Sequence, residues 1–223
     1  MVIKRQPKQR ARSDQDKVAR REQLLTVAAQ LWQEKNFSSI TMNEVAARAN
    51  LAKGTTYLYF QTKEELLLAL LERELQSWFL ELLTKLNATP DFTPKEFAKL
   101  VVKSLETRQT FIRLLCIQAS ILEHNIGFDR ALEFKYFLLE HANNGASLLE
   151  SKLEFLKRGE GVVLLQRINA LIIGFYDLAN PSEVVQTVLE KPELKPLRLD
   201  FFKQLQTTLE TLLIGLETQR RKT

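Results

Sequence analysis

The sequence predicts an all-α protein, with a small helical N-terminal head followed by a larger helical body. The chain of 223 residues contains only seven Gly and six Pro. Helix-favouring residues such as Leu, Ala, Glu, Lys and Gln dominate most segments, and no segment alternates apolar and polar residues as a half-buried strand does. Because 45% of the residues are hydrophobic, the chain can also bury a substantial core.

The first helix is predicted over residues 17–35, where apolar residues recur at spacings of three and four. Its expected buried stripe is Leu24, Ala28, Leu31 and Trp32.

Two short helices are predicted next. Thr41 and Glu44 have the T-x-x-E spacing of a capping box, which predicts a second helix over residues 41–49. Asn50 and the residue after it form a turn, and a third helix is predicted over 53–60. Helices this short are not stable alone, so both are expected to pack on the first helix. The residues expected to make this packing are Val45, Ala46, Ala49, Leu51 and Phe60.

A fourth helix, over residues 63–87, carries more apolar surface than one stripe needs and is expected to connect head and body. Thr93, Pro94 and Glu96 predict a further helix start, with a cap, a proline at the first position and a box-closing Glu. Later helices are predicted at residues 109–125, 129–157, 160–179 and 198–219.

The net charge of +5 lies entirely in residues 1–25, which hold eight Lys or Arg and three Asp or Glu. We interpret this segment as a polyanion-binding end whose first sixteen residues are disordered; the alternative is a solubilising tail. Cys116 is the only cysteine, so no intrachain disulfide can form and a reducing cytoplasm is expected. The apolar stretches are shorter than the roughly 20 residues of a membrane span, so no membrane is expected as a partner.

Residues 21–67 resemble the tetracycline-repressor (TetR) class of bacterial regulators. The matching residues are Ala28-Ala29-Gln30-Leu31-Trp32, Phe37, Ile40-Thr41-Met42-Asn43-Glu44-Val45-Ala46, Lys53-Gly54-Thr55-Thr56-Tyr57-Leu58-Tyr59-Phe60 and Lys63-Glu64-Glu65-Leu66-Leu67. The resemblance implies a DNA-binding domain at residues 17–77 with its helix-turn-helix at 41–60, and a ligand-binding and dimerisation domain at 78–223. It implies a repressor that a small molecule releases from a palindromic operator.

The third helix is the expected reading element, because a helix enters the major groove only if its leading residues are small or can hydrogen-bond. Gly54 and Thr55 meet this condition, and Lys53 can donate to guanine or phosphate; the alternative is an ordinary helix start. The resemblance implies that Tyr57 and Tyr59 reach the operator as well. The full set of expected DNA contacts is Thr41, Lys53, Gly54, Thr55, Tyr57, Leu58, Tyr59 and Lys63, with Thr41 and Lys63 on phosphates.

Three positions depart from the family pattern. Asn50 stands where Gly is usual in the turn, although Asn tolerates positive φ better than most residues. Ala52 replaces a common Ser cap, and Thr56 replaces a common aliphatic residue. These departures leave the fold prediction unchanged and make the operator sequence less predictable.

The two last long helices are expected to pair with those of a second copy as a four-helix bundle, as the family resemblance implies; the alternative is a core within one chain. Their apolar faces are Val162, Val163, Leu165, Ile168, Leu171, Ile172 and Phe175, with Phe202, Leu205, Leu209, Leu212, Leu213 and Leu216. The candidate effector contacts are aromatic or polar residues within apolar helices: Trp78, Phe111, Cys116, His124, Tyr136, His141 and Tyr176.

No cofactor or metal is expected, because the two histidines are seventeen residues apart without Cys or carboxylate at ligand spacing. An enzyme is the rival class, but the sequence has no Gly-rich phosphate loop, no His-Glu-x-x-His and no nucleophile beside a plausible base. A second rival is an architectural DNA-binding protein without an effector.

Overall fold

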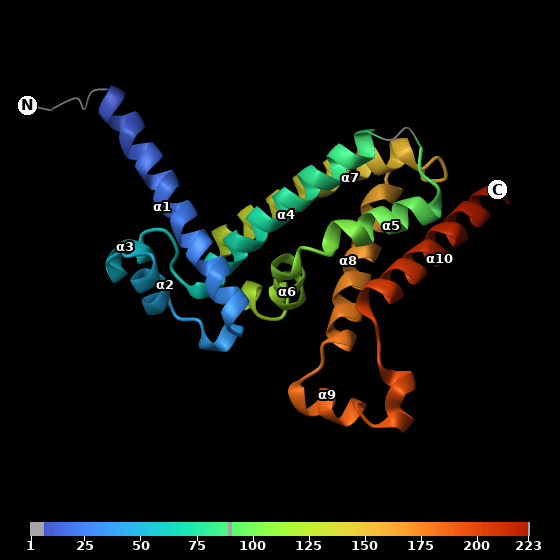
Figure 1. Ribbon diagram of the computed structural model, residues 1–223. Helices are drawn as coiled ribbons and strands as arrows, with labels where there is room; N and C mark the ends of the chain where they lie inside the picture. The colour runs from blue at the N-terminus through green and yellow to red at the C-terminus, as the bar shows by residue number, and fades with distance from the viewer. Residues whose placement is uncertain (1–6, 89–90, 223) are drawn as a thin grey trace, which may run out of the picture. The chain divides into compact units, whose positions relative to one another are not determined.

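The computed structural model describes residues 7–88 and 91–222, with side chains from residue 14 onward. Every regular element in this part of the chain is a helix, which confirms the predicted fold class (Figure 1). The α-helices are α1 (Pro7–Glu34), α2 (Met42–Arg48), α3 (Lys53–Tyr57), α4 (Lys63–Ala88), α5 (Pro94–Leu105), α6 (Gln109–Gln118), α7 (Phe128–Lys152), α8 (Glu160–Ala179), α9 (Glu183–Leu189) and α10 (Phe201–Arg221). The 3-10 helices are η1 (Phe37–Ser39), η2 (Leu122–Asn125) and η3 (Pro192–Leu197).

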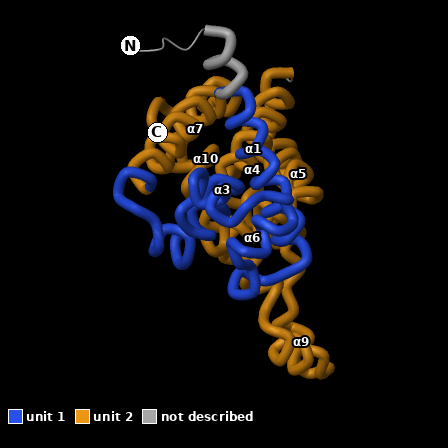
Figure 2. The backbone as a smooth tube through the Cα atoms, turned by 90° about the vertical axis from the view of Figure 1, so that its left-hand side faces the viewer, with its two compact units in different colours: residues 1–71, 118–130 blue, residues 72–117, 131–223 orange. Residues whose placement is uncertain are grey.

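The chain forms two compact units, coloured separately in Figure 2. The first comprises residues up to 71 together with 118–130, and the second comprises 72–117 and residues from 131 onward. The sequence prediction placed 118–130 with the C-terminal domain. In the structure this segment lies with the head, where Leu122 is fully buried and Thr62 Oγ1 donates to the carbonyl of Asn125 (3.2 Å).

The head is built around the apolar stripe of α1, as predicted. Leu24, Ala28 and Leu31 are fully buried there. From the following helices, Val45, Ala46, Ala49 and Phe60 are also buried, whereas Leu51 is half-buried. The short helices therefore obtain their stability from packing on α1 rather than from their own backbone hydrogen bonds.

Helix α1 begins at Pro7, so the prediction of a disordered arm over residues 1–16 is wrong for residues 7–16. Proline fits the first turn of a helix, where no backbone donor is needed, and the Gln, Arg and Ala residues that follow lose little entropy in a helix. Residues 1–6 of the predicted arm lie outside the described part. The basic segment is thus largely an extension of the first helix.

Two of the helices predicted after residue 100 end earlier than expected. The segment predicted at 109–125 is helical only to Gln118 and continues as η2, whose turn buries Leu122. The helix predicted to reach residue 157 ends at Lys152. The predicted start at Thr93 is confirmed, including the reciprocal capping box with Glu96.

Helices α7 and α8 approach each other closely because two glycines face the contact. A Cβ on Gly161 would lie 2.6 Å from the carbonyl oxygen of Ala146 on α7. A Cβ on Gly145 would lie 3.3 Å from Cδ1 of Leu165 on α8 and 2.7 Å from Cε1 of Phe79 on α4. Between α7 and α8, Glu150 accepts from the backbone N–H groups of Gly159 (2.8 Å) and Gly161 (2.9 Å). Helix α10 packs on α5 and α8 and completes the second unit.

Helix α8 is long and apolar enough to cross a membrane by length and composition, although the apolar stretches of the sequence predicted no such segment. Only 17% of its apolar window is buried. Arg167 stands in the middle of the helix, where a membrane would impose a cost of about 3 kcal/mol. Part of this apolar surface, including Val163 and Leu178, is exposed, and the central arginine disfavours lipid as its cover.

Candidate functional site

The turn between α2 and α3 is a Schellman motif, in which two backbone N–H groups bond back to the last turn of the helix. The N–H of Leu51 donates to Ala46 (2.9 Å), and that of Asn50 donates to Ala47 (3.1 Å). Asn50 has φ of 51°, the left-handed conformation that such a turn requires. The expectation that Asn50 tolerates positive φ in place of Gly is confirmed.

Helix α3 ends at Tyr57, three residues before the predicted end at Phe60. Its first residue follows Ala52, which makes no side-chain capping bond. After Tyr57 the hydrogen bonds span three residues, and the N–H of Leu58 donates to the carbonyl of Thr55 (3.2 Å). Phe60 turns inward and is 4% exposed, with the guanidinium of Arg21 5.5 Å from its ring centre. Burial of Phe60 thus fixes the short helix against the head, which is the anchoring role predicted for it.

The predicted DNA contacts lie mainly on the outside of the head. Leu58 is 83% exposed and Tyr57 is 40% exposed, so two neighbouring large side chains are available to a partner outside the chain. The ammonium of Lys53 lies 5.9 Å from the ring centre of Tyr57. Thr41, Lys53 and Gly54 are also exposed, whereas Thr55, Tyr59 and Lys63 are half-buried.

Gly54 is exposed, and a Cβ built on it would meet no atom of the chain within 4 Å. Packing within the chain therefore does not require glycine at this position. Glycine in a helix is less stable than alanine by about 0.5–1 kcal/mol, and the missing side chain leaves the backbone at the start of α3 open to close approach from outside the chain.

Thr56 is the buried exception on α3. It is fully buried, and its hydroxyl has no hydrogen-bond partner. An aliphatic side chain of the same shape would fill this place without leaving a polar group unsatisfied. The departure from the family pattern at Thr56 is thus a local defect in the packing of the head.

Thr41 caps α2, but only half of the predicted capping box forms. Its Oγ1 accepts from the N–H of Glu44 (3.3 Å). The Glu44 carboxylate instead accepts from Lys35 Nζ (2.7 Å). The backbone N–H of Thr41 is therefore not bonded to the Glu44 carboxylate. It lies at an exposed helix start, where a phosphate can bind.

Lys63 is held by the head itself. Its ammonium donates to the carbonyl of Phe37 (3.0 Å) and lies 4.0 Å from the centre of that ring. An ammonium has three N–H donors, so this arrangement fixes the side chain while leaving donors for a second acceptor.

Polar contacts brace α1 against α2. Gln23 Nε2 donates to the carbonyl of Ala49 (2.8 Å), next to the turn. Arg48 donates to both carboxylate oxygens of Glu34 (2.7 and 2.6 Å), and this hydrogen bonding lowers the pKa of Glu34. These contacts hold the turn in one orientation relative to α1, which is what positions the exposed residues of α3.

The second unit contains a nearly filled apolar cavity of about 10 Å³. No lining side chain is charged, and the indole Nε1 of Trp78 already donates to Ser104 Oγ (2.8 Å). The lining residues are Trp78, Phe79, Leu82, Leu83, Leu86, Phe97, Val101, Gly145, Leu149, Leu165 and Ile168. Such walls suit an uncharged apolar group rather than a charged one.

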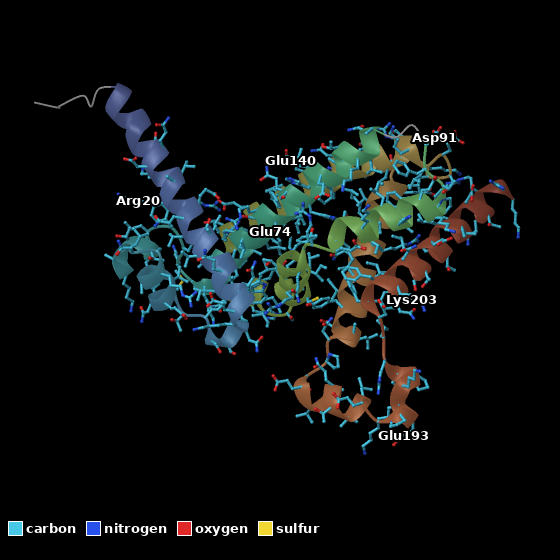
Figure 3. All side chains as sticks on the ribbon, in the orientation of Figure 1. Arg20, Glu74, Asp91, Glu140, Glu193 and Lys203 are labelled. Atoms are coloured by element: carbon cyan, nitrogen blue, oxygen red, sulfur yellow. The ribbon has the colours of Figure 1, made fainter. Side chains whose placement is uncertain are left out.

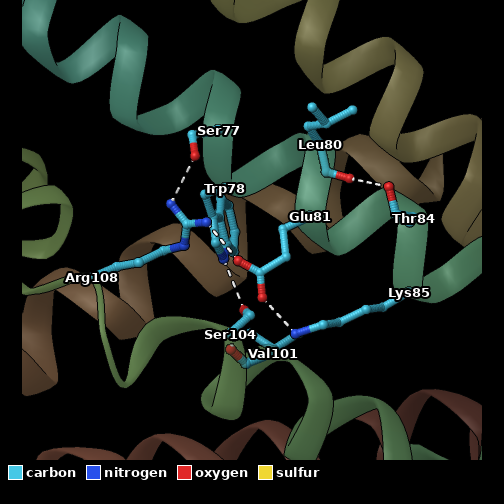
Figure 4. Close-up of polar contacts among 9 residues, drawn as sticks. All are labelled: Ser77, Trp78, Leu80, Glu81, Thr84, Lys85, Val101, Ser104 and Arg108. Carbon is cyan, nitrogen blue, oxygen red and sulfur yellow. Dashed lines mark hydrogen bonds and ion pairs between the residues drawn. The ribbon is translucent and has the colours of Figure 1, made fainter.

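A polar network lies beside this cavity on α4 (Figure 4). Arg108, which follows α5, donates to Ser77 Oγ (3.2 Å) and to the carboxylate of Glu81 (2.5 Å). Glu81 also accepts from Lys85 (2.5 Å), and the bond from Arg108, followed by that from Lys85, lowers the pKa of Glu81. The network ties α4 to the junction of α5 and α6, the helices around Trp78.

Of the predicted effector contacts, only Trp78 lines the cavity. Phe111 lies directly behind it, with ring centres 5.3 Å apart. Tyr136 is 63% exposed, and His124 is exposed in η2. The sequence could not separate these residues, because an aromatic side chain in an amphipathic helix looks the same whether it faces a cavity, the core or water.

Cys116 on α6 and Tyr176 on α8 are half-buried and do not line the cavity. Burial, with the neighbouring Asp177 carboxylate, raises the pKa of the Cys116 thiol to about 12. Tyr176 packs edge-on against Phe201 (5.4 Å between ring centres), and burial raises its pKa. His141 contacts the ring of Phe79 (5.8 Å) from behind the cavity wall.

Sequence reasoning missed most of the cavity walls. Phe79 and Ile168 are ordinary apolar helix residues whose spacing predicts burial but not a shared cavity. Gly145 carries the one available signal, because an unexplained glycine inside a helix indicates a close approach. In the described part of the chain, no three His, Cys, Asp or Glu side chains cluster in a way that could hold a metal ion.

Comparison with known proteins identifies both parts of the chain. Residues 24–70 match the family described as bacterial regulatory proteins, tetR family, and residues 72–220 match the tetracyclin repressor-like C-terminal domain. Together the two matches span nearly the whole chain.

Solved structures share the fold at low sequence identity. A protein from Syntrophomonas wolfei assigned to the TetR family of transcriptional regulators has 19% identity and a TM-score of 0.60, over 89% of this chain and 97% of that one. The fatty acid degradation regulator FadR from Bacillus halodurans has 18% identity and a TM-score of 0.55 (88% and 95%). The TetR family repressor AlkX from Dietzia sp. has 16% identity and a TM-score of 0.55 (89% and 95%).

Proposed function

Because the chain belongs to the TetR family of bacterial transcriptional regulators, we propose that it is a homodimeric repressor released from a two-fold symmetric operator by an uncharged apolar molecule. Regulators of this family bind operator DNA and act as dimers with small-molecule ligands. The observation that carries the proposal is the outer face of α3. There an exposed glycine without a packing role lies beside an exposed lysine, tyrosine and leucine.

The residues divide by role on the DNA. Lys53, Gly54 and Thr55 at the start of α3 read base edges, and the small side chains let the backbone enter the major groove. Tyr57, Leu58 and Tyr59 extend this surface, with Leu58 as an apolar contact for a thymine methyl group. Thr41 and Lys63 bind phosphates and set the register of the head without reading sequence.

The dimer forms through α8 and α10. One side of each helix is buried within the chain, as for Ile168, Ile172 and Leu209. The other side carries half-buried or exposed apolar residues, including Val163 (41% exposed) and Ile214 (46%). Pairing these outer sides with those of a second copy gives a four-helix bundle and covers the apolar surface of α8. DNA binding of such a dimer implies a cytoplasmic location.

The effector acts through the second unit. It replaces the side chains that fill the cavity, so Phe79 and its neighbours on α4 must shift. Because α4 runs without a break from the cavity to the head, such a shift changes the spacing of the two reading helices. That spacing must match one DNA turn, about 34–36 Å. Release requires that the effector binds the two states with different affinity.

The test begins with selection of binding sites from random duplex DNA, followed by footprinting on the selected sequence. A protected inverted repeat with half-sites about one turn apart is expected. Uniform weak binding would instead favour an architectural DNA-binding protein, and no binding at all would favour the rival class of a helical-bundle enzyme.

Gly54→Ala tests the reading face. Since the added Cβ meets nothing within the chain, the free energy of unfolding should rise by about 0.5–1 kcal/mol, while operator affinity falls because the backbone can no longer approach the bases. Gly127→Ala is the control for operator binding, because that Cβ also meets nothing and the residue lies in the same unit, outside any helix. Unchanged operator affinity in Gly54→Ala would remove α3 from the groove.

A further inference from the structure

Between α8 and α10 the chain leaves the body of the second unit and returns. We call residues 180–199, which include α9 and η3, the α9–η3 arm. Figures 1 and 2 show it projecting beyond the ends of α8 and α10, and Figure 3 places Glu193 at its far end. No residue of α9 or η3 is buried.

The arm exposes a concentration of apolar side chains. Val184 is 75% exposed, Val185 43%, Val188 46% and Leu197 66%. At its root on α8, Leu178 is 63% exposed. Single exposed apolar residues are normal on a protein surface, but a group of them on one short segment marks an interaction site.

Little within the chain holds the arm in its helical form. Helix α9 has seven residues, too few to be stable in water without packing. It packs mainly on η3, and the polar contacts within the arm include Gln186 Nε2 to the carbonyl of Pro181 (2.9 Å) and Arg198 Nε to that of Leu189 (2.6 Å). Where the arm joins the rest of the second unit, an open space of about 230 Å³ lies between the end of α8 and helix α9. The arm therefore needs an apolar surface to cover it.

We propose that the α9–η3 arm docks on the second copy of this chain and extends the dimer interface beyond the α8–α10 bundle. This inference rests on the proposed dimer. The arm begins at the end of α8 and ends at the start of α10, the two helices that carry the proposed interface. The exposed Leu178 at the end of α8 lines the same open space as Leu189 of α9. Because the dimer is two-fold symmetric, the arm of each copy contacts the other copy in the same way.

The charge of the arm also favours a protein partner. Its three acidic residues balance its three basic residues, so it has no net charge to attract DNA or an anionic membrane. The acidic residues are Glu183, Glu190 and Glu193, and the basic residues are Lys191, Lys195 and Arg198.

The test replaces the apolar side chains without removing the arm. In the double variant Val184→Ser, Val188→Ser, each copy no longer buries two apolar side chains. The dissociation constant of the dimer, measured by analytical ultracentrifugation, should therefore rise by roughly 30-fold or more. Val18→Ser is the matched control, since Val18 is 64% exposed on α1, in the first unit, and should leave the constant unchanged. Circular dichroism checks that helix content is retained.

Hydrogen exchange provides a second measurement on the unmodified full-length protein. Amides of residues 183–197 should be protected at protein concentrations where the dimer forms and should exchange rapidly after dilution to monomer. Rapid exchange of the arm in the dimer, or an unchanged dissociation constant in the double variant, would overturn the proposal. If the unmodified protein is a monomer at all concentrations, the proposed dimer itself fails, which is a distinguishable result.

Discussion

Two residues in the helix-turn-helix of the head lower its local stability. The turn uses Asn50 in the left-handed conformation where glycine would be less strained. Thr56 occupies a fully buried position with an unsatisfied hydroxyl. Neither residue contacts the proposed DNA surface through its side chain, so both can be changed to measure stability separately from binding.

Thr56→Val should increase the free energy of unfolding by about 1 kcal/mol, because it replaces a buried hydroxyl without a partner by a methyl group of similar size. Thermal or urea unfolding measures the effect. Thr26→Val is the control: that hydroxyl is exposed and donates to the carbonyl of Glu22 (2.9 Å), so no gain is expected. A decrease in the stability of Thr56→Val would mean that its hydroxyl is satisfied in solution.

Glu81→Gln should make stability less dependent on acid pH. The pKa of Glu81 lies below its ordinary value of 4.5 in the folded protein, through the bonds from Arg108 and Lys85. A lowered folded pKa stabilises the fold above about pH 4.5, and this contribution disappears as pH falls through the lowered value. The variant should therefore be less stable at pH 7, by under ~1 kcal/mol for a partly exposed pair, and its stability should fall less on acidification.

Unfolding curves between pH 7 and pH 3 measure this difference. Glu217→Gln removes a carboxylate that pairs with Arg221 on the surface (2.8 Å) and serves as the control. If both variants show the same pH profile as the unmodified protein, the contacts between Arg108 and Glu81 do not persist in solution.

At the level of helices, α1 joins the basic N-terminal segment to the core of the head. Its last turns are buried through Leu24 and Leu31, while its first turns precede that core and carry most of the excess positive charge. A helix can hold basic residues in register along a DNA backbone, at a smaller entropy cost than a flexible tail. This segment should thus strengthen binding with little sequence preference.

Deletion of residues 4–12 removes five basic side chains and should lower operator affinity while making its salt dependence less steep. For every phosphate that is no longer neutralised, the slope of log affinity against log salt decreases in magnitude by about 0.9. Replacing the same five residues with Gln keeps the helix length and should give the same change. An unchanged slope in both variants would show that the segment does not bind DNA.

For the molecule as a whole, effector control requires that binding in the second unit alters the first. The units are joined by the continuous helices α4 and α7 and by the passage from α6 into η2. The ring of Phe111 on α6 packs at a tilt against Trp78 of the cavity, and the Asn125 carbonyl of η2 accepts from Thr62 just before α4. A change around Trp78 can therefore reach the head along α4 and along the passage from α6 into η2.

The variant Trp32→Phe leaves Trp78 as the sole tryptophan and therefore as a reporter of the cavity. Neutral apolar compounds should change its fluorescence and lower operator affinity over the same concentration range. Cationic dyes of similar size should do neither, because no charged side chain lines the cavity. A cationic compound that both changes Trp78 emission and releases DNA would contradict the proposed effector class.

The residue pattern alone predicted the helical class, the order of the head helices and the buried stripe of α1, because periodicity and capping act over a few residues. It also predicted the Asn50 turn and the helix start at Thr93. These features depend on local backbone preferences, which a sequence displays directly.

The cavity, the early end of α3 and the exposed α9–η3 arm depended on contacts between distant residues. Phe60 is buried in the core of the head three residues after α3 ends, and Gly145 leaves space for Phe79 from another helix. No local pattern distinguishes an apolar residue that lines a cavity, such as Ile168, from one that is exposed on the surface of the chain, such as Val184. Burial is a property of the whole packed chain, so these assignments follow from long-range packing.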